Sequence, residues 1–404
     1  MRHIMNDHIE RISGLEKQYV EEVLQTNFSS SAGANFMKRF EAEFSKRYLN
    51  YHSISFINGT ATMHAALEAA GIGPGDEVIV PPLTMASTTF AVLQANGSPV
   101  FADVDENTFQ ISPEDIKKKI TPNTKAVISV ALYGGSPKLD EIRNICNEHN
   151  LFFLEDNAEC FGATYKGVPV GCYGDAASFS FQSSKHLTSG EGGVLIIKDD
   201  QLADKVRSFQ SLGYIGLGAK EAKIDKQTIQ NPNYLRHKSL GFNYRMPELC
   251  AAVALAQTER MDELIEPRKV AGKRFSEISK SFPDILKEQE NYDGATNSYW
   301  TWVALLNQDI SWMDFKQCYL EFGGDPFYGA WALTFDEPFI TNRCFYKREQ
   351  FLTKNSKSNL LNPNCETASR IQKQLCQFQT NCYSHDHLNK QCFALEKTLK
   401  TLNG

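Results

Sequence analysis

The segment Leu151-Phe152-Phe153-Leu154-Glu155-Asp156, an apolar run that ends in two acids, decides the fold class. It belongs to a series of short β-branched or aromatic runs that alternate with helix-like stretches between Ser53 and about Lys198. We expect strands at Ser53–Ile57, Glu77–Val80, Pro99–Ala102, Ala126–Val130, Leu151–Leu154, Ala176–Phe181 and Gly193–Ile197. This alternation is typical of a mainly parallel sheet covered by helices on both faces. Ligands of such sheets bind beyond the carboxyl ends of the strands, so the residues that close each strand are the candidate site.

The chain changes character on both sides of this region. The N-terminal segment has apolar residues at helical spacing, and a helix is predicted from Pro247 to about Leu264. The polar stretch Gly213–Lys238 is predicted to be a long loop near the active site. The C-terminal third is rich in Phe, Tyr, Asn and Gln and lacks the parallel-sheet pattern. We therefore expect a large domain over residues 30–265 and a small domain built from residues 1–29 and 266–404.

Composition limits the classes of function. The 404 residues are 42% hydrophobic and 22% charged, which is ordinary for a soluble globular enzyme. The formal net charge of −6 argues against a nucleic-acid-binding protein. No apolar run approaches the ~20 residues of a membrane span, and Met1–Leu24 is too polar for a secretory signal. The 10 cysteines form no CxxC pair or zinc-like cluster, so we expect a cytoplasmic protein without a metal site.

One strand end carries a candidate anion site. The motif Asn58-Gly59-Thr60-Ala61 closes a strand and opens a helix. Gly59 allows the backbone to approach a ligand closely. The amides of Thr60 and Ala61 at the helix N-terminus, together with the Thr60 hydroxyl, can bind an anion. A capped helix without a ligand explains the motif equally well.

Two further strand ends carry charged groups. Glu155 and Asp156 could bind a metal, act as a base or pair with a protonated ring nitrogen, and an exposed strand end is the simpler alternative. The run Ser178-Phe179-Ser180-Phe181-Gln182-Ser183-Ser184-Lys185-His186 leads into a glycine-rich bend, Gly190-Glu191-Gly192-Gly193. Its serines could hold an anion, and a partly desolvated Lys185 could perform Schiff-base chemistry. The alternative for a lone lysine is a solvated surface amine.

Taken in order, these motifs and Gly241-Phe242-Asn243-Tyr244-Arg245 resemble the DegT/StrS family of pyridoxal 5′-phosphate (PLP) sugar aminotransferases. The resemblance covers about residues 30–265 and includes the spacing between Asp156 and Lys185. It implies the type I PLP aminotransferase fold, in which a mostly parallel sheet is sandwiched by helices and joined to a smaller α+β domain. It also implies a homodimer whose subunits share their active sites.

The resemblance assigns roles to individual residues. Lys185 would be the catalytic residue, which holds PLP through its ε-amine and then shuttles a proton, and Asp156 would pair with the pyridinium nitrogen. Asn243 would reach the phosphate of the neighbouring subunit's cofactor. Glu159 would lie near the cofactor's O3′ and the substrate, and Met85 takes the place of the aromatic residue that usually stacks on the ring. The phosphate-binding set would be Gly59, Thr60, Ala61 and Ser180.

The implied reaction is transfer of an amino group, usually from L-glutamate, to the ketone of a nucleotide-linked deoxysugar, a step in deoxyamino-sugar and polysaccharide biosynthesis. Met85 and Ala131 replace residues that are common in the family, which leaves open a smaller phosphorylated ketone or a sugar without a nucleotide. Sugar dehydration is a further alternative, because a deoxygenating branch of the family replaces the lysine by histidine. Lys185 favours transamination over dehydration. The presence of both Lys185 and Asp156 also argues against a non-catalytic protein that uses this fold only for binding or regulation.

Other candidate residues have structural explanations. His186 is expected to be a packing or hydrogen-bonding neighbour of the lysine. Five aromatic residues could line a substrate cleft, but we expect them to belong to the core; they are Trp300, Trp302, Phe327, Tyr328 and Trp331. The partners implied are therefore small molecules and a second copy of the chain, with no nucleic acid and no membrane.

Overall fold

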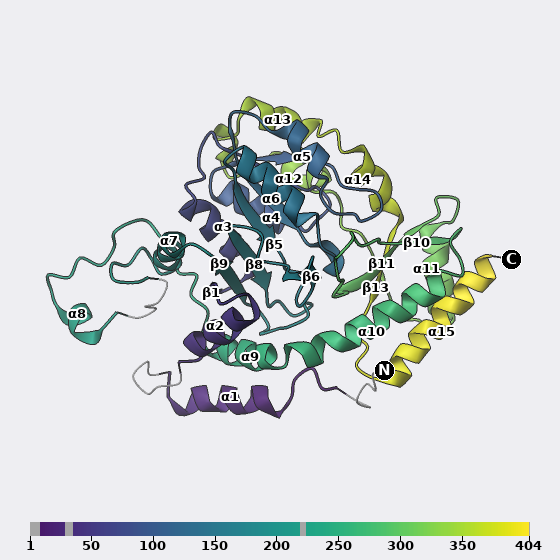
Figure 1. Ribbon diagram of the computed structural model, residues 1–404, viewed down its shortest axis with the longest axis horizontal. Helices are drawn as coiled ribbons and strands as arrows, with labels where there is room; N and C mark the ends of the chain where they lie inside the picture. The colour runs from purple at the N-terminus through teal and green to yellow at the C-terminus, as the bar shows by residue number, and fades with distance from the viewer. Residues whose placement is uncertain (1–8, 29–34, 219–223, 404) are drawn as a thin grey trace.

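The computed structural model describes residues 9–28, 35–218 and 224–403, and its centre is a seven-stranded sheet (Figure 1). The strand order is β1-β9-β8-β5-β4-β2-β3. The strands are β1 (His52–Phe56), β2 (Glu77–Val80), β3 (Ser98–Phe101), β4 (Thr124–Val130), β5 (Phe152–Asp156), β8 (Ala176–Ser180) and β9 (Gly193–Ile197). Each of them overlaps one predicted strand, so the predicted series is confirmed.

The strand directions place the carboxyl ends of the central strands together. Neighbouring strands run parallel from β3 to β8, and β9 pairs antiparallel with both β8 and β1. The register aligns Val130 with Asp156 and Asp156 with Ser178. The ends of β4, β5 and β8 therefore form one edge, where ligands of open α/β sheets bind.

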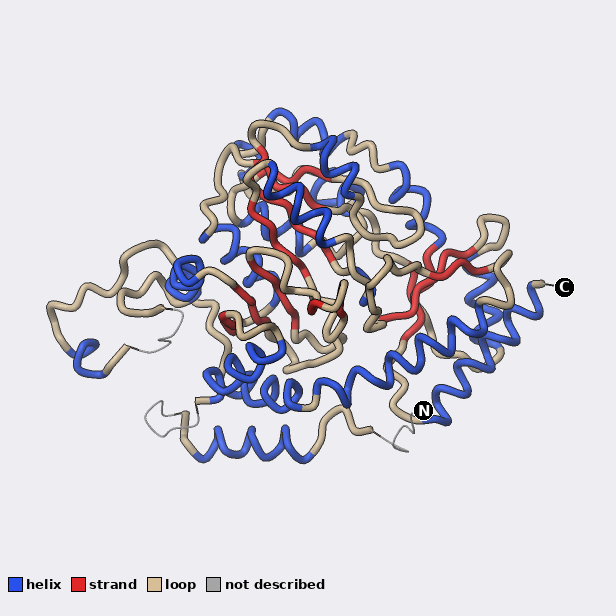
Figure 2. Tube along the Cα trace, in the orientation of Figure 1, coloured by secondary structure: helices blue, strands red, loops and turns tan. Residues whose placement is uncertain are grey.

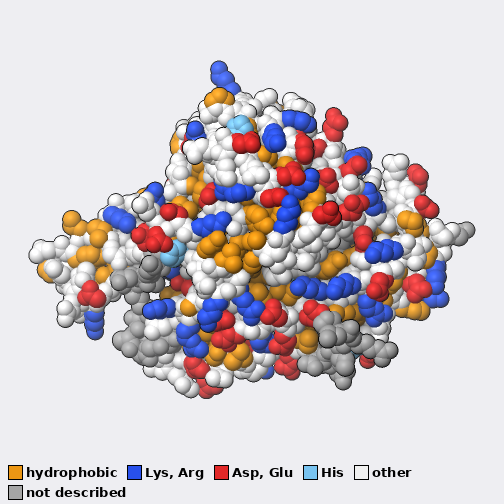
Figure 3. All heavy atoms as spheres, in the orientation of Figure 1, with side chains coloured by type: hydrophobic (Ala, Val, Ile, Leu, Met, Phe, Trp, Pro, Cys, Tyr) orange, Lys and Arg blue, Asp and Glu red, His pale blue; other side chains and the backbone are white. Residues whose placement is uncertain are grey.

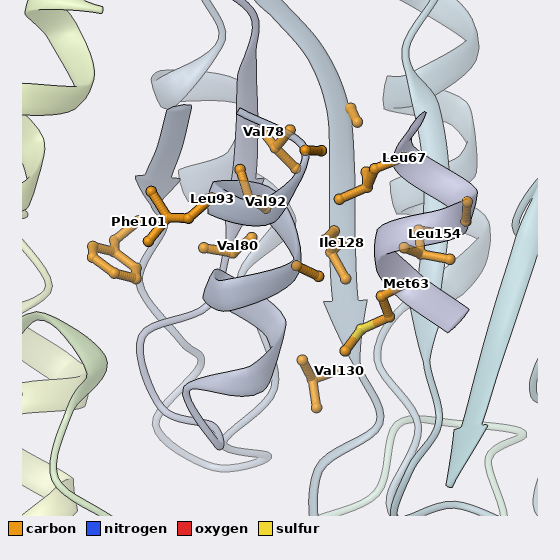
Figure 4. Close-up of a cluster of buried hydrophobic side chains, with 14 of the residues drawn as sticks. Met63, Leu67, Val78, Val80, Val92, Leu93, Phe101, Ile128, Val130 and Leu154 are labelled. Carbon is orange, nitrogen blue, oxygen red and sulfur yellow. The ribbon is translucent and has the colours of Figure 1, made fainter. Parts of the chain in front are cut away.

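Helices cover both faces of this sheet. On one face, α3 (Gly59–Ala69) and α4 (Ser87–Gln94) pack on β2, β3, β4 and β5 through apolar side chains (Figure 4). The side chains labelled there are Met63, Leu67, Val78, Val80, Val92, Leu93, Phe101, Ile128, Val130 and Leu154. On the other face, α2 (Phe36–Arg47) and α9 (Glu248–Glu259) share a buried cluster with Val194 and Ile196. Burial on both faces explains why the strands read as continuous apolar runs.

The C-terminal part forms a second, antiparallel sheet with the order β10-β11-β13-β12. Its strands are β10 (Leu286–Glu288), β11 (Thr301–Leu306), β12 (Tyr328–Gly329) and β13 (Leu375–Gln379). The helices that pack against it are α10 (Met261–Ser279), α11 (Trp312–Glu321) and α15 (His385–Leu402). Trp302, Phe315 and Phe378 are buried between the layers. This is the expected smaller α+β unit, and the predicted fold class is confirmed.

Several further elements lie outside the two larger sheets (Figure 2). They are α1 (Gly14–Gln25), α5 (Pro113–Lys119), α6 (Leu139–Glu148), α7 (Asp200–Gln210), α8 (Lys226–Gln230) and a short hairpin of β6 (Thr164–Tyr165) and β7 (Val168–Pro169). The segment that carries α8 projects from the body of the molecule (Figures 1 and 2). It includes most of the predicted loop, of which residues 219–223 lie outside the described residues.

The predicted helix from Pro247 to about Leu264 is two helices in the structure, so this prediction is wrong in its length. α9 ends at Glu259, and Arg260 leaves the helical backbone with φ −97° and ψ 13° before α10 begins. The Arg260 guanidinium donates to Glu16 Oε1 at 2.8 Å and to Glu10 O at 2.6 Å. These contacts with the N-terminal segment accompany the bend, and the sequence has no Gly or Pro there to signal it.

Three short helices of the C-terminal third lie beside the large sheet. They are α12 (Pro338–Thr341), α13 (Lys354–Leu361) and α14 (Glu366–Ile371). The Asn359 side chain accepts from Phe101 N at 2.6 Å and donates to Phe101 O at 3.2 Å. α13 thus pairs with the open edge strand β3, which would otherwise leave unpaired backbone groups. The two-domain division stays a prediction, and its boundary at residues 29 and 30 lies outside the described residues.

The surface carries both signs of charge. Lys and Arg side chains are intermingled with Asp and Glu over the face in Figure 3. None of the described helices is both long enough and apolar enough to cross a membrane.

Candidate active site

A cavity of about 350 Å³ opens at the carboxyl edge of the large sheet. Residues of the large sheet and its loops form most of its walls, and Trp300 and Trp331 contribute from the C-terminal third of the chain. Among the predicted site residues, those that line it are Gly59, Thr60, Met85, Asp156, Glu159, Ser180 and Lys185. Residues from four separate motifs therefore meet at one place, as the strand directions require. Ala61 and Asn243 are not among the lining residues.

Asp156 closes β5 with its carboxyl group in the cavity. Its Oδ2 accepts from the Thr88 hydroxyl at 2.8 Å, and its Oδ1 accepts from Ala158 N at 3.2 Å. Burial raises the pKa of Asp156 above its ordinary range, and the hydrogen bond from Thr88 opposes this increase. Glu155, one residue earlier, points to the opposite face, where its carboxylate accepts from three backbone amides. Of the two acids, only Asp156 serves the site.

Lys185 lies in the bend that follows β8, and its amine reaches the cavity. Its Nζ is 3.2 Å from Glu159 Oε1 and 4.4 Å from the centroid of the Trp300 ring. The ammonium thus has a carboxylate on one side and the face of an indole on the other, and both attract a cation. The predicted alternative of a solvated surface amine does not describe this side chain, because it is only 13% exposed.

The Glu159 carboxyl group contacts both Lys185 and the backbone that follows β4. Its Oε2 accepts from Tyr133 N at 3.1 Å, where the Tyr133 backbone is left-handed with φ 63°. Burial raises the pKa of Glu159, although the charge of Lys185 and the Tyr133 amide oppose this increase. The carboxyl group is therefore fixed by the main chain with one oxygen toward the amine, where it can exchange a proton with it.

The predicted phosphate site lies at the N-terminus of α3. Asn58 caps the helix, since its Oδ1 accepts from Ala61 N at 2.8 Å. In this geometry the Ala61 amide serves the cap, whereas Gly59, Thr60 and Ser180 line the cavity. A Cβ on Gly59 would lie 3.1 Å from the Ser180 Cβ, so the absence of a side chain keeps this cradle open. An anion here would meet the positive end of the helix.

Two predicted residues lie at the margin of the site. Met85 lines the cavity and is half exposed in the single chain, and its predicted place over the cofactor ring stays a prediction. Asn243 is exposed on the segment that follows α8, where its backbone pairs with Ser211. Within one chain it contributes nothing to the cavity, and its predicted role at a neighbouring subunit's cofactor stays a prediction.

The structure adds residues that the motifs did not reveal. Thr88 holds Asp156, while Trp300 and Trp331 line the cavity and stack on each other with centroids 6.0 Å apart. The expectation that Trp300 and Trp331 belong only to the core is therefore wrong. It is also wrong for Tyr328, which is exposed, whereas Trp302 and Phe327 are core residues. Their aromatic type was the available signal, but no local pattern places them beside Lys185. His186 is buried with Nε2 3.0 Å from Ser298 O, in line with its predicted packing role.

The residues present fit PLP. A buried carboxyl group suits a protonated ring nitrogen, the Lys185 amine suits the aldehyde, and the helix N-terminus with Ser180 suits the phosphate. Site and fold together define a PLP-dependent enzyme of the aminotransferase type. The chain belongs to the DegT/DnrJ/EryC1/StrS aminotransferase family, whose model matches residues 10–318. The resemblance inferred from the motifs is thus confirmed and extends beyond them.

Relatives agree with this membership, and solved structures share the fold. A GDP-perosamine synthase of Vibrio cholerae is 34% identical over 299 residues, which are 74% of this chain and 77% of the relative. A GDP-perosamine synthase of Caulobacter vibrioides is 37% identical over 307 residues, with 74% and 77% covered. An aminotransferase structure from Psychrobacter cryohalolentis has a TM-score of 0.85 at 24% identity, covering 99% of this chain and 100% of its own. The fold is also that of an E. coli GDP-4-keto-6-deoxy-D-mannose-3-dehydratase with bound hydrated PLP, at a TM-score of 0.80, 21% identity and coverage of 97% and 100%.

Proposed function

We propose that this protein binds PLP at Lys185 and transfers an amino group, with L-glutamate as donor, to the ketone of a nucleotide-linked deoxysugar. The observation that carries the proposal is the meeting of the Lys185 amine and the buried Asp156 carboxyl group in one cavity of an aminotransferase-family chain. A lysine amine and a buried carboxyl group that line the same cavity are the groups that PLP chemistry uses.

The residues of the chain have separate tasks in this reaction. When bound, PLP supplies an electron sink that stabilises negative charge on the reacting carbon. Asp156 would pair with the ring nitrogen and favour its protonated form, and the Thr88 hydroxyl and the Ala158 amide orient the carboxyl group for that contact. Lys185 Nζ carries the proton to and from the reacting carbon. Glu159 lies 3.2 Å from that nitrogen and can hold the proton between transfers.

The identity of the keto substrate rests on the relatives. The names of two similar proteins specify GDP-perosamine, a nucleotide-linked sugar, so GDP-linked keto-deoxysugars are the first substrates to test. The stacked Trp300 and Trp331 at the cavity provide an apolar face on which a sugar ring can lie. Dehydration is the second candidate, since a solved dehydratase shares the fold. Lys185 supports amination, because the dehydrating branch has histidine at this position.

Assembly and location complete the proposal. We propose a homodimer in which Asn243 of each chain reaches the other chain's cavity, supported by the exposure of its side chain and its absence from the walls of its own chain's cavity. The cytoplasmic location expected from the sequence stays a prediction, and the ten cysteines are free thiols in the structure.

A direct test compares amino acceptors. Purified enzyme with PLP and L-glutamate is assayed for 2-oxoglutarate release with GDP- and dTDP-linked keto-deoxysugars, the corresponding free sugars and small phosphorylated ketones. We expect turnover with at least one nucleotide-linked ketone and much slower turnover with the others. Turnover of the small ketones alone would reject the nucleotide-sugar assignment.

A further inference from the structure

The turn that carries Lys185 is held by two side chains from outside the large sheet. The carbonyl oxygens of three consecutive residues, Ser183, Ser184 and Lys185, each accept a hydrogen bond from one of them. Arg11 Nη2 donates to Ser183 O at 2.6 Å and to Lys185 O at 2.8 Å. Trp300 Nε1 donates to Ser184 O at 2.9 Å. The turn is neither helix nor strand, so these contacts satisfy carbonyls that no regular structure pairs.

Arg11 is itself fixed to the same part of the molecule. Its carbonyl oxygen accepts from Gln257 Nε2 at 2.8 Å, and the Gln257 Oε1 accepts from Thr188 N at 3.2 Å. Gln257 is fully buried on α9, and its Nε2 also donates to Glu16 Oε1 at 2.6 Å. One buried amide therefore fixes both the main chain of Arg11 and the far end of the lysine turn. The main chain of Arg11 is therefore fixed relative to the turn that its guanidinium contacts.

Trp300 restrains the same lysine in a second way. Its indole nitrogen holds the Ser184 carbonyl, and its ring lies 4.4 Å from Lys185 Nζ. The carbonyl of Trp300 accepts from the buried Arg268 at 2.7 Å, which fixes the tryptophan main chain. Trp300 touches the reacting amine directly, whereas Arg11 contacts only main-chain oxygens of the turn in these interactions.

We propose that Arg11 is a positioning residue for Lys185, an inference that rests on the proposed role of Lys185 in holding PLP. By binding the carbonyls on both sides of Ser184, the guanidinium sets the direction in which the lysine side chain leaves the backbone. That direction places Nζ between Glu159 and Trp300. Charge-assisted hydrogen bonds are stronger than neutral ones, so an arginine suits this task.

The test uses a graded series and a matched control. Arg11→Met keeps the length of the side chain and removes its donors, and Arg11→Lys keeps the charge with a different donor geometry. Arg260→Met is the control, because Arg260 holds the same N-terminal segment through Glu10 O and Glu16 without touching the lysine turn. Each protein is assayed for kcat and KM. The pH midpoint of the visible absorbance of lysine-bound PLP and the hydrogen exchange of residues 181–188 in cofactor-free protein are also measured.

We expect Arg11→Met to lower kcat by about 10- to 100-fold, with the KM for the keto substrate changed by less than about twofold, because a misplaced reacting group slows the chemical step. The pH midpoint should shift and the turn should exchange faster. Arg11→Lys should lie between wild type and Arg11→Met in all three measurements, and Arg260→Met should resemble wild type.

Two results would overturn the inference. One is wild-type kcat, pH midpoint and exchange in both Arg11 variants. The other is an equal effect of Arg260→Met, which would assign the loss to general anchoring of the N-terminal segment. Failure of the proposed function would appear differently: borohydride reduction would leave no PLP on Lys185 of the wild type, while the exchange measurement, made without cofactor, would still report on the contact with Arg11.

Discussion

Two buried acids share one cavity with Lys185, and their neighbours give them different tasks. Asp156 accepts from the Thr88 hydroxyl and the Ala158 amide, which orient it from the side of the sheet. Glu159 accepts from the Tyr133 amide and presents its other oxygen to the lysine. Burial raises the pKa of both carboxyl groups. Because their hydrogen-bond partners differ, the two acids can take different roles in one site. Asp156 is suited to an electrostatic role, and Glu159 is suited to proton transfer.

Asp156→Asn separates the charge of this residue from its shape. The amide oxygen can still accept from Thr88, and Lys185 is untouched, so we expect PLP to remain bound. We expect kcat to fall by about 100-fold or more, as when a preorganised electrostatic group is lost. Visible absorbance measures the bound cofactor, and the amination assay measures the rate. Asp140→Asn, which changes an acid paired with Lys166 away from the cavity, is the control. Wild-type turnover of Asp156→Asn would contradict the assigned role.

Glu159→Gln tests the cost of burying a carboxyl group. Burial raises the pKa of Glu159 above its ordinary 4.5, so the folded state binds this proton more tightly than the unfolded state. The wild type therefore loses unfolding free energy as the pH rises from about 4.5 through the raised value. We expect Glu159→Gln to gain stability relative to wild type across that window, with a constant difference at lower pH. Urea unfolding of the cofactor-free proteins at several pH values measures this, and a difference that is flat or falls with pH would refute it.

At the scale of elements, β9 packs directly on the loop that opens α3. A Cβ on Gly193 would lie 2.6 Å from the main-chain carbonyl of Asn58 and 2.8 Å from Gly59 N. Because these are backbone atoms, no side-chain rotation can relieve the overlap. We expect Gly193→Ala to lower the unfolding free energy by roughly 1–3 kcal/mol and to weaken PLP binding through the displaced cradle. Gly73→Ala is the control, since a Cβ there meets nothing within 4 Å. Equal behaviour of the two variants in urea unfolding would contradict this packing.

The sequence predicts the elements whose signals are local. The seven strands of the large sheet are short apolar runs, and the parallel pairing of β5 with β8 brings Asp156, Ser180 and Lys185 together. The bend at Arg260 and the position of Trp300 depend on contacts between distant segments, which no periodicity encodes. The Trp300–Ser184 hydrogen bond joins residues 116 positions apart. The motif predicts a capped helix as one alternative, but the choice of the Ala61 amide as the partner of Asn58 depends on the backbone conformation of the turn.

At the scale of the whole molecule, the single chain exposes apolar side chains in the segment that follows α8. Leu235 and Leu240 are about four-fifths exposed, at 79% and 80%, and the neighbouring Phe242 is at 37%. A second copy that covers this segment would bury them and bring Asn243 toward the partner's cavity. This exposure and the absence of Asn243 from the cavity walls of its own chain support the proposed shared site.

Mixed dimers test this sharing. Subunits with Lys185→Ala are co-expressed with differently tagged subunits that carry Asn243→Asp, and the mixed dimer is isolated with both tags. If Asn243 acts across the interface, one site of the mixed dimer has both native residues, and we expect about half of the wild-type activity. Each parent homodimer should be nearly inactive. The Lys185→Ala dimer lacks the reacting amine, and in the Asn243→Asp dimer the added carboxylate repels the phosphate. An inactive mixed dimer, or a monomeric protein, would contradict the shared site.

The fate of the amino nitrogen tests the proposed reaction most directly. Enzyme with PLP is incubated with L-glutamate labelled with heavy nitrogen and a GDP-linked keto-deoxysugar, and the sugar product is analysed by mass spectrometry. We predict that the label appears on the sugar with wild-type enzyme and is absent with Lys185→Ala. A sugar product that has lost a hydroxyl group and carries no labelled nitrogen would contradict amino transfer and assign the chain to dehydration.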